Sequence, residues 1–324
     1  MSGNPLNILD FEKPIAELDA QIEEIKRLAA EADEDRSEEI ASLEKHRDRL
    51  IEQIFSNLTE WDQTLLARHP KRPYTLDFIR LMFDDYVELH GDRLFADDKA
   101  MIGGIGVIGN KNVVFVGQQK GRDLKERQFR NFGSAKPEGY RKALRLMKLA
   151  EKFDKPVICF VDTPAADCSV GAEERGISEA IARNLMEMSR LRTPIIIVVL
   201  GEGGSGGALG IGVGDKVLML EHAVYSVIPP EGCAAILFRD PSRKAEAAAA
   251  LKLTSQHALQ FGVVDEVIPE PLGGAHRNVE AAAKTLKSAI LRNIDELLGF
   301  NKEELIERRY QKLRSMGQFV VEEP

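Results

Sequence analysis

A run of glycines that follows an apolar stretch constrains this chain more than any other feature. Residues 201–208 read Gly-Glu-Gly-Gly-Ser-Gly-Gly-Ala, directly after the apolar residues Ile195–Leu200. This order predicts a buried strand, a glycine turn and the start of a helix, where the first backbone N–H groups lack intrahelical acceptors. Glycine lets a ligand approach the backbone closely, and a helix N-terminus favours negative oxygen. The turn is therefore suited to binding an enolate or another oxyanion.

The composition argues against several classes of protein. The chain has 324 residues, enough for a full core, and its formal charge of −8 lacks the basic footprint of a nucleic-acid binder. No apolar run approaches the length of a membrane span, and the first residues do not resemble a signal peptide. Three scattered cysteines and six histidines show neither a disulfide framework nor a metal-ligand spacing. We expect a cytoplasmic protein that has no metal of its own.

The first part of the chain, residues 1–72, is expected to form a helical hairpin. Residues 12–61 are rich in charge and free of glycine, and apolar residues recur at helical spacing on both sides of an acidic break at residues 32–39. A lone pair of helices buries such a stripe poorly. We therefore expect the apolar face to pack on the main domain or on a partner. A solvated charged coil is the alternative.

From residue 73 to residue 278 the pattern becomes that of an α/β domain, and residues 279–324 are expected to form a helical extension. Strands that alternate with helices imply parallel pairing with crossover connections. Helices are expected at Gly139–Phe153, Ser178–Arg190 and Val279–Gln311. Strands are expected within Gly103–Gln119, with a turn at Asn110–Asn112, and at Pro156–Val161, Pro194–Leu200, Val217–Leu220 and Ala223–Ile228.

The glycine run on its own leaves several functions open. It fits neither the dinucleotide-binding spacing G-x-G-x-x-G, with its later acidic residue, nor the phosphate-binding loop that ends in Lys-Ser or Lys-Thr. Residues 203–207 do match G-x-S-x-G, which would make Ser205 a hydrolase nucleophile if a base stood nearby. A turn needed only for packing is the remaining alternative.

Two further segments are candidates for ligand contact. The basic strip at residues 120–130 follows a predicted strand, and its cations, Lys120 and Arg122 among them, could hold phosphate or carboxylate groups. A solvated helix face explains the strip equally well. Asp162-Thr163-Pro164 also follows a strand, in the position where loops carry function. Glu173 and Glu174 fit the first turn of a helix better than a role as acid or base.

Taken together, these segments resemble one family, the alpha subunits of the bacterial-type acetyl-CoA carboxylase carboxyltransferase. The similarity extends from the amino-terminal helices to about Met316, and its specificity comes from the order and density of the motifs. They are His90-Gly91-Asp92-Arg93, Gln119-Lys120-Gly121-Arg122, Arg130-Asn131-Phe132-Gly133, residues 137–143, Gly171–Gly176, Ser178–Arg190, Gly201–Ala208, Tyr225-Ser226-Val227-Ile228, Pro230-Glu231-Gly232-Cys233-Ala234 and residues 269–278.

The resemblance implies a crotonase-type α/β superhelix of ββα units and an α2β2 carboxyltransferase. In that family a zinc-ribbon beta subunit carries the metal and most of the acetyl-CoA site, and no metal is expected in this chain. The alpha subunit faces carboxybiotin, which the biotin carboxyl carrier protein delivers, and biotin carboxylase completes the wider complex. The carboxyl group passes to the coenzyme A thioester, which gives malonyl-CoA in the first committed step of fatty-acid synthesis.

The resemblance also implies which residues contact the substrate. The family's oxyanion donors fall on the backbone N–H groups of Gly206 and Gly207, with Ala208, Gly203 and Gly204 beside them. Further contacts to substrate or carboxybiotin are expected from Lys120, Arg122, Pro164 and Ala165. Loss of carboxylate leaves negative charge on the biotin ureido oxygen, which such donors stabilise. The ureido nitrogen itself can then act as the base.

The chain departs from the family pattern after Asp162-Thr163-Pro164. The family usually continues Gly-Ala-Tyr-Pro-Gly, whereas this chain has Ala165-Ala166-Asp167-Cys168-Ser169, and Gln118 stands where a histidine is common. The loop change bears on ligand contacts and on acyl selectivity. A self-sufficient crotonase-type hydratase or hydrolase, and a non-catalytic scaffold subunit, are the two alternative functions.

Overall fold

The computed structural model describes residues 8–317. The helices are η2 (Asp10–Glu12), α1 (Lys13–Ala32), α2 (Ser37–Phe55), α3 (Glu60–Ala67), α4 (Thr75–Met82), α5 (Leu124–Phe129), η3 (Asn131–Gly133), α6 (Pro137–Lys152), α7 (Val170–Glu174), α8 (Ile177–Arg190), α9 (Ser205–Leu209), α10 (Pro230–Leu237), η4 (Pro241–Arg243), α11 (Lys244–Leu251), α12 (Ser255–Gln260), α13 (Val279–Leu297) and α14 (Lys302–Arg314). The strands are β1 (Asp85–Glu88), β2 (Met101–Ile108), β3 (Lys111–Gln118), β4 (Val157–Thr163), β5 (Ile195–Gly204), β6 (Lys216–Leu220), β7 (Val224–Ser226) and β8 (Glu266–Ile268).

One mixed sheet of eight strands forms the centre of the fold. Its order is β1-β2-β3-β4-β5-β6-β8, and β7 pairs with the end of β5. The first three strands are antiparallel, and every later pair is parallel. The predicted α/β class with parallel crossovers is therefore confirmed. The turn between β2 and β3 lies at Gly109 and Asn110, one residue earlier than predicted, and Gly109 takes a φ of 60° there.

The two central strands are buried along almost their whole length. β4 is buried at every position and β5 at all but its last, as expected for parallel strands covered on both faces. β5 is longer than predicted, because Glu202, Gly203 and Gly204 pair with β7. Residues 201–204 are thus strand rather than turn, and the helix α9 begins directly at Ser205.

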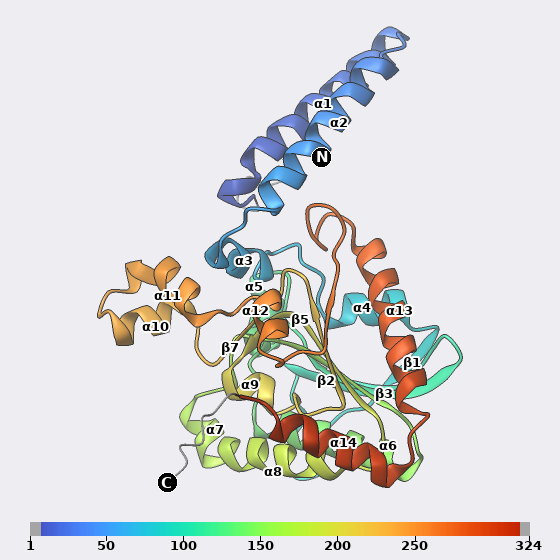
Figure 1. Ribbon diagram of the computed structural model, residues 1–324, viewed down its shortest axis with the longest axis vertical. Coiled ribbons are helices and arrows are strands. Elements are labelled where there is room, and N and C mark those ends of the chain that lie inside the picture. The colour runs from blue at the N-terminus through green and yellow to red at the C-terminus, as the bar shows by residue number, and fades with distance from the viewer. Residues whose placement is uncertain (1–7, 318–324) are drawn as a thin grey trace, which may run out of the picture.

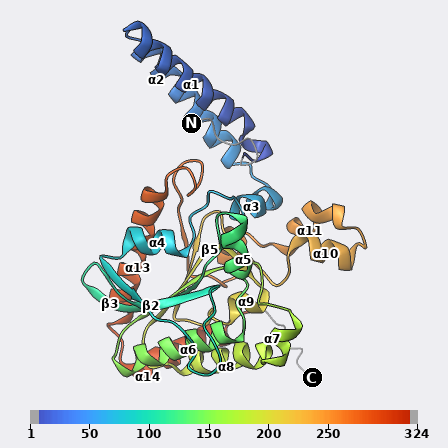
Figure 2. The ribbon, with the colours of Figure 1, turned by 180° about the vertical axis from the view of Figure 1, so that it is seen from behind.

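Helices cover the sheet on different sides. Figures 1 and 2 show α6, α8 and α14 along one side of the sheet, and α4 and α13 along another. Tyr140, Ala143 and Met147 of α6 are fully buried against this core, as their helical spacing predicts. Leu144, expected on the same face, is only partly buried, and Leu146 is buried in its place. None of the helices within residues 8–317 is long and apolar enough to cross a membrane.

The helical hairpin is present, and it stands away from the rest of the molecule (Figure 1). Its two helices pack on each other, so that Ile15, Ile22 and Ile51 are buried while Leu28 remains 39% exposed. The apolar stripe is thus buried mainly between the two helices and near their base. The main domain therefore covers the stripe only near the base of the hairpin, and packing of the rest on a partner stays a prediction.

Buried polar groups join the base of the hairpin to the core. The carboxylate of Glu12 lies 2.8 Å from Nε2 of His276 and 3.6 Å from Nε2 of His69, and the two imidazole rings lie 4.1 Å apart. Arg277 donates to Asp19 of α1 at 2.7 Å. These contacts connect three segments that are distant in the sequence.

The C-terminal part is helical but is divided into α13 and α14 instead of one continuous helix. Arg309 of α14 is fully buried and donates to both oxygens of Asp215, at 2.8 and 2.7 Å, and to three backbone carbonyls. This arginine fixes α14 on the core. The domain boundaries at residues 72 and 278 stay a prediction, and residues 1–7 and 318–324 lie outside the described part.

We expect Glu12→Gln to loosen the hairpin base. Burial raises the pKa of Glu12, but the hydrogen bonds from His276 and Leu9 and the charges of His276 and His69 together outweigh burial and leave the pKa below its ordinary value. The neutral amide weakens a charge-assisted hydrogen bond, so opening should become easier by about 1–3 kcal/mol. Hydrogen exchange of the α1 amides measures this change. Glu17→Gln, on an exposed position of α1, is the matched control.

The same pair of variants gives a pH dependence. Because the folded-state pKa of Glu12 lies below that of the unfolded chain, about 4.3, its contribution is complete above that pH and is lost as the pH falls through the folded value. The difference in exchange between wild type and Glu12→Gln should therefore shrink below about pH 4. A difference that grew on acidification would contradict this role.

Candidate functional site

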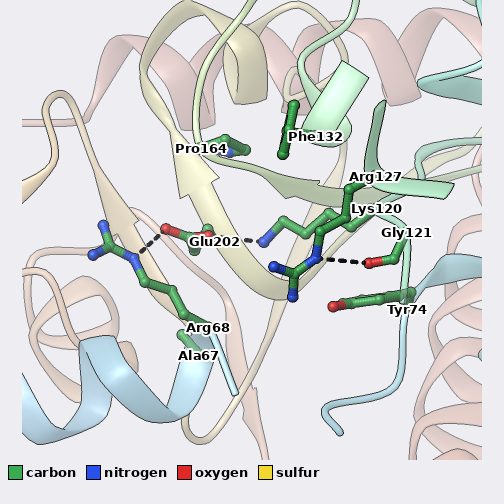
Figure 3. Close-up of a pocket in the computed structure, with 9 residues that line it drawn as sticks. All are labelled: Ala67, Arg68, Tyr74, Lys120, Gly121, Arg127, Phe132, Pro164 and Glu202. Atoms are coloured by element: carbon green, nitrogen blue, oxygen red, sulfur yellow. Dashed lines mark hydrogen bonds and ion pairs between the residues drawn. The ribbon is translucent and has the colours of Figure 1, made fainter. Parts of the chain in front are cut away.

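The C-terminal ends of β3, β4 and β5 meet at one edge of the sheet, where a cavity of about 150 Å³ opens (Figure 3). We call it the main cavity. It is lined by Ala67, Arg68, Tyr74, Lys120, Gly121, Arg127, Phe132, Pro164 and Glu202. This edge is the place where open α/β sheets bind ligands.

A network of ion pairs lies at the main cavity and includes three of the residues that line it, Arg68, Lys120 and Glu202. Nζ of Lys120 lies 2.8 Å from Oδ1 of Asp162 and 2.8 Å from Oε2 of Glu202. Arg68 approaches the other oxygen of Glu202 at 2.6 Å and reaches Glu231 at 2.7 Å (Figure 3 shows the first contact). Each of the two cations is therefore shared between two carboxylates.

The network fixes the charges of its members. Burial raises the pKa of Glu202, but the charges of Lys120 and Arg68 outweigh burial and lower the pKa to about 2. Burial lowers the pKa of Lys120, but Asp162 and Glu202 outweigh it and raise the pKa above its ordinary value. Neither group exchanges a proton near neutral pH. Lys120 lines the main cavity, but its charge is already neutralised by protein carboxylates, and its contact with substrate stays a prediction.

The glycine-rich segment where β5 passes into α9, residues 204–208, lies beside this network, and we call it the glycine turn. Ser205, the first residue of α9, has a φ of 49°, in the left-handed region that few residues other than glycine adopt. The carbonyl of Gly207 accepts hydrogen bonds from Nε2 of Gln118 at 3.0 Å and from the hydroxyl of Tyr140 at 3.2 Å. Gln118 also accepts from the N–H of Asp162 at 3.1 Å. The turn is thus held in one orientation by buried side chains.

Close packing against the loop after β4 explains two of the glycines. A Cβ at Gly207 would lie 2.5 Å from the carbonyl carbon of Ala165 and 2.6 Å from the nitrogen of Ala166. A Cβ at Gly204 would overlap the carbonyl of Pro164. Packing therefore explains why glycine stands at positions 204 and 207 of the glycine run. A Cβ at Gly206 would meet only Ile181, at 3.6 Å, so packing does not require glycine there.

The other predicted contact residues occupy different places. Gly203, Gly204 and Pro164 line a small side cavity of about 20 Å³, which shares Arg68, Pro164 and Glu202 with the main cavity. Ala208 is fully buried. Arg122 does not line the main cavity: it donates to the carbonyls of Pro70 and Arg72, pairs with Asp77 and lies over the ring of Tyr74.

The loop that departs from the family pattern is held by local hydrogen bonds. The carbonyl of Ala165 accepts from the hydroxyl of Thr163 at 2.7 Å, and the N–H of Asp167 donates to Ala135 at 3.0 Å. Ser169 is the N-cap of α7 and accepts from the N–H of Ala172. Cys168 is exposed. The replaced residues thus form an ordered entry to α7.

The position of Ser205 between a strand and a helix is the position a hydrolase nucleophile would take. The chain's histidines are placed elsewhere. His69, His222 and His276 gather at the hairpin base, and His257 approaches Thr254 at 2.9 Å. His90 lies near Asp97, and His46 lies on α2. This distribution does not favour a serine hydrolase.

Glu12, His69 and His276 are the one group in the described chain whose ligand atoms cluster closely enough to hold a metal, within 4.8 Å of one another. Their hydrogen bonds favour another role. Nδ1 of His69 accepts from the N–H of Lys71 at 3.1 Å, so the neutral ring carries its proton on Nε2, the nitrogen that faces Glu12. A metal-bound His normally donates from its outer nitrogen. The sequence did not reveal this cluster because its members lie far apart in the chain.

Sequence reasoning missed most of the main cavity. Arg68, Tyr74, Phe132 and Glu202 were not singled out as site residues, and Arg127 was only part of a basic strip. The motifs around residues 120 and 132 were the available signal, but they do not say which side chains face inward. Only folding brings the end of α3, Arg127 of α5 and the end of β5 together.

Solved structures show the fold of this chain. It is similar to a chain of a Pseudomonas malonate decarboxylase hetero-tetramer in complex with coenzyme A, with a TM-score of 0.58, 16% identity, and coverage of 74% of this chain and 94% of that one. A transcarboxylase 12S chain matches with a TM-score of 0.51 and 23% identity over 64% of this chain and 40% of the other. The crotonase-like α/β architecture is therefore confirmed.

Sequence relatives show the family. The model described as acetyl co-enzyme A carboxylase carboxyltransferase-like matches residues 8–317. The acetyl-coenzyme A carboxylase carboxyl transferase subunit alpha of Methylococcus capsulatus is 53% identical, covering 98% of this chain and 99% of the relative. That of Fusobacterium nucleatum is 54% identical, covering 96% and 99%. With its cavity and glycine turn at the end of the parallel strands, this chain belongs to the acetyl-CoA carboxylase carboxyltransferase family, as an alpha subunit.

Proposed function

We propose that this chain, together with a zinc-ribbon beta subunit, transfers the carboxyl group of carboxybiotin to acetyl-CoA. The substrate would arrive on a biotin carboxyl carrier protein, and biotin carboxylase would recharge that carrier. In the transfer the N–CO₂ bond of the ring breaks, a C–C bond forms to the acetyl methyl carbon, and the methyl proton passes to the ureido nitrogen. The observation that carries the proposal is the glycine turn at the C-terminal edge of β5.

The backbone N–H groups of Gly206 and Gly207 are the proposed oxyanion donors, with Gly203, Gly204 and Ala208 beside them. They belong to the first turn of α9, where N–H groups point away from the helix without intrahelical acceptors. The hydrogen bonds to the carbonyl of Gly207 hold that turn rigid before substrate arrives. Such preorganised donors lower the free energy of a developing negative charge.

The side chains near the turn support a mechanism in which the substrate supplies the base. Glu202, with a pKa of about 2, stays ionised and paired, and Lys120 is held by two carboxylates. A general base works best with a pKa near the operating pH. Neither side chain meets that requirement, which favours the ureido nitrogen of the substrate as proton acceptor.

Exposed apolar side chains on α9 and on or next to α10 support the requirement for a partner. Leu209 of α9 is 45% exposed, and Val227, Ile236 and Leu237, on and next to α10, are each at least 67% exposed. Exposed apolar surface of this kind marks protein interfaces. We propose that the beta subunit covers it and brings the coenzyme A thioester to the turn.

The first test is malonyl-CoA formation from acetyl-CoA and a carboxylated biotin carrier. We expect activity from this chain mixed with a cognate beta subunit and none from either chain alone. Turnover of acyl-CoA by this chain alone would instead favour the independent hydratase or hydrolase. A stable complex without activity would favour the scaffold.

The second test separates donor geometry from packing. Gly207→Ala forces the backbone of residues 165–166 to move, and misplacing one oxyanion donor typically costs about 10²–10³ in rate. Gly206→Ala, whose Cβ has room, should retain most of the activity. The kcat of each variant in the two-subunit enzyme measures the effect, and subunit co-elution checks assembly. Equal activity of both variants and wild type would contradict the proposal.

A further inference from the structure

Arg127 differs from the other cations of the main cavity in having no carboxylate partner. Its Nε donates to the carbonyl of Gly121 at 3.2 Å, and no ion pair within residues 8–317 includes it. Lys120 and Arg68, in contrast, are each paired with two carboxylates. Arg127 therefore keeps its two terminal nitrogens for another acceptor. Figure 3 shows its guanidinium group between Lys120 and Tyr74.

The local backbone fixes the direction of this side chain. A Cβ at Gly121 would overlap the backbone nitrogen of Arg127, so that only glycine lets α5 pack so closely on this segment. The N-cap residue Asp123 accepts from the N–H of Glu126 at 2.8 Å and holds the first turn of α5. With Nε used by the Gly121 carbonyl, the terminal nitrogens point into the main cavity.

Phe132 forms an apolar wall of the same cavity from an unusual backbone. Asn131, Phe132 and Gly133 have φ values of 44°, 55° and 83°, three successive residues in the left-handed region. Such strain persists where the surroundings enforce it, and it clusters at ligand sites. The side chain of Asn131 donates to the carbonyl of Ser134 at 2.7 Å and braces the turn. The ring of Phe132 is half exposed and, with Pro164, lines the cavity.

The charges around the cavity make Arg127 decisive for an anion. Lys120 and Arg68 contribute two positive charges, and Asp162, Glu202 and Glu231 contribute three negative charges. Because this set holds one more negative than positive charge, it would weakly repel an incoming anion. Attraction must come from the unpaired guanidinium group, whose planar fork matches the two oxygens of a carboxylate.

We propose that Arg127 and Phe132 form a subsite for a carboxylate carried on a flat ring. Arg127 donates from its terminal nitrogens to the carboxylate oxygens, and Phe132 packs against the ring. The inference rests on the proposed function, because the N-carboxylated ureido ring is the substrate of that kind. A phosphate group of coenzyme A offers the same oxyanion chemistry, and the experiment below distinguishes the two sources.

The test is the forward reaction of the two-subunit enzyme, with the carrier carboxylated in place by biotin carboxylase. We expect Arg127→Gln to raise the KM for the carboxylated carrier about tenfold or more, because hydrogen bonds between charged groups are lost. The KM for acetyl-CoA should stay unchanged. Lys125→Gln removes the same charge from an exposed position of α5 and should leave both constants unchanged.

Phe132 is tested in the same assay. Phe132→Ala should raise the KM for the carrier, and Phe132→Tyr should restore most of it, since the tyrosine ring presents the same flat face. Co-elution with the beta subunit and near-ultraviolet circular dichroism check that each variant is folded. If Arg127→Gln fails this check, Arg127→Lys takes its place. Lysine keeps the positive charge but lacks the planar fork of arginine, so the KM for the carrier should lie between those expected for wild type and Arg127→Gln.

Three outcomes would decide against parts of this account. An increase in the KM for acetyl-CoA with Arg127→Gln would assign the arginine to a phosphate of coenzyme A and overturn the carboxylate subsite. Unchanged constants in both Arg127→Gln and Phe132→Ala would overturn the subsite altogether. Absence of malonyl-CoA with the wild-type enzyme would refute the proposed function itself, before any variant is compared.

Discussion

The buried contact between Lys120, Asp162 and Glu202 is the interaction on which the site depends. It joins the ends of β3, β4 and β5 at the edge where the cavity opens. Removing one partner of a buried ion pair typically costs about 3–5 kcal/mol, because the remaining charge loses its compensation. The N–H of Glu202 also donates to Asp162, which ties the backbone of β5 to the same group. The spacing of the strand ends therefore depends on charges that are neutralised within the protein.

This arrangement divides the work between side chains and backbone. Side chains supply rigidity: Gln118 connects β3, the backbone of Asp162 and the carbonyl of Gly207. The backbone supplies the proposed oxyanion donors, which carry no side chain that could rotate or titrate. Glycine is needed where residues 164–166 lie against β5 and α9, since a methyl group at Gly204 or Gly207 would collide with that loop. Packing thus explains the glycines at positions 204 and 207, and the proposed chemistry uses backbone N–H groups of the same short segment.

The sequence predicted the parts of the fold that depend on local pattern. Helical periodicity located α6 and α8, and apolar runs located β4 and the first part of β5. The extension of β5 through Gly204 was missed, because it depends on pairing with β7, which glycine-rich sequence does not suggest.

The sequence also could not predict contacts between distant segments, because such contacts depend on tertiary pairing and not on local pattern. The cluster of Glu12, His69 and His276 joins three parts of the chain whose spacing carries no signal. In the main cavity, the motif containing Lys120 was recognised, but the pairing of Lys120 with Asp162 and Glu202 was not, so its charge was expected to be available to a ligand. Arg127 showed the reverse: nothing in the basic strip distinguished it from its neighbours. Its lack of a carboxylate partner within residues 8–317 is a property of the folded chain alone.

The protonation of the site has a consequence for catalysis. Glu202 has a pKa of about 2, and the pKa of Lys120 is raised above its ordinary value, which already lies well above neutrality. Backbone N–H groups and an arginine guanidinium do not titrate in the physiological range. The proposed machinery of this subunit therefore keeps the same charge from mildly acidic to mildly basic pH. A dependence of the chemical step on pH near neutrality would then arise from groups other than these.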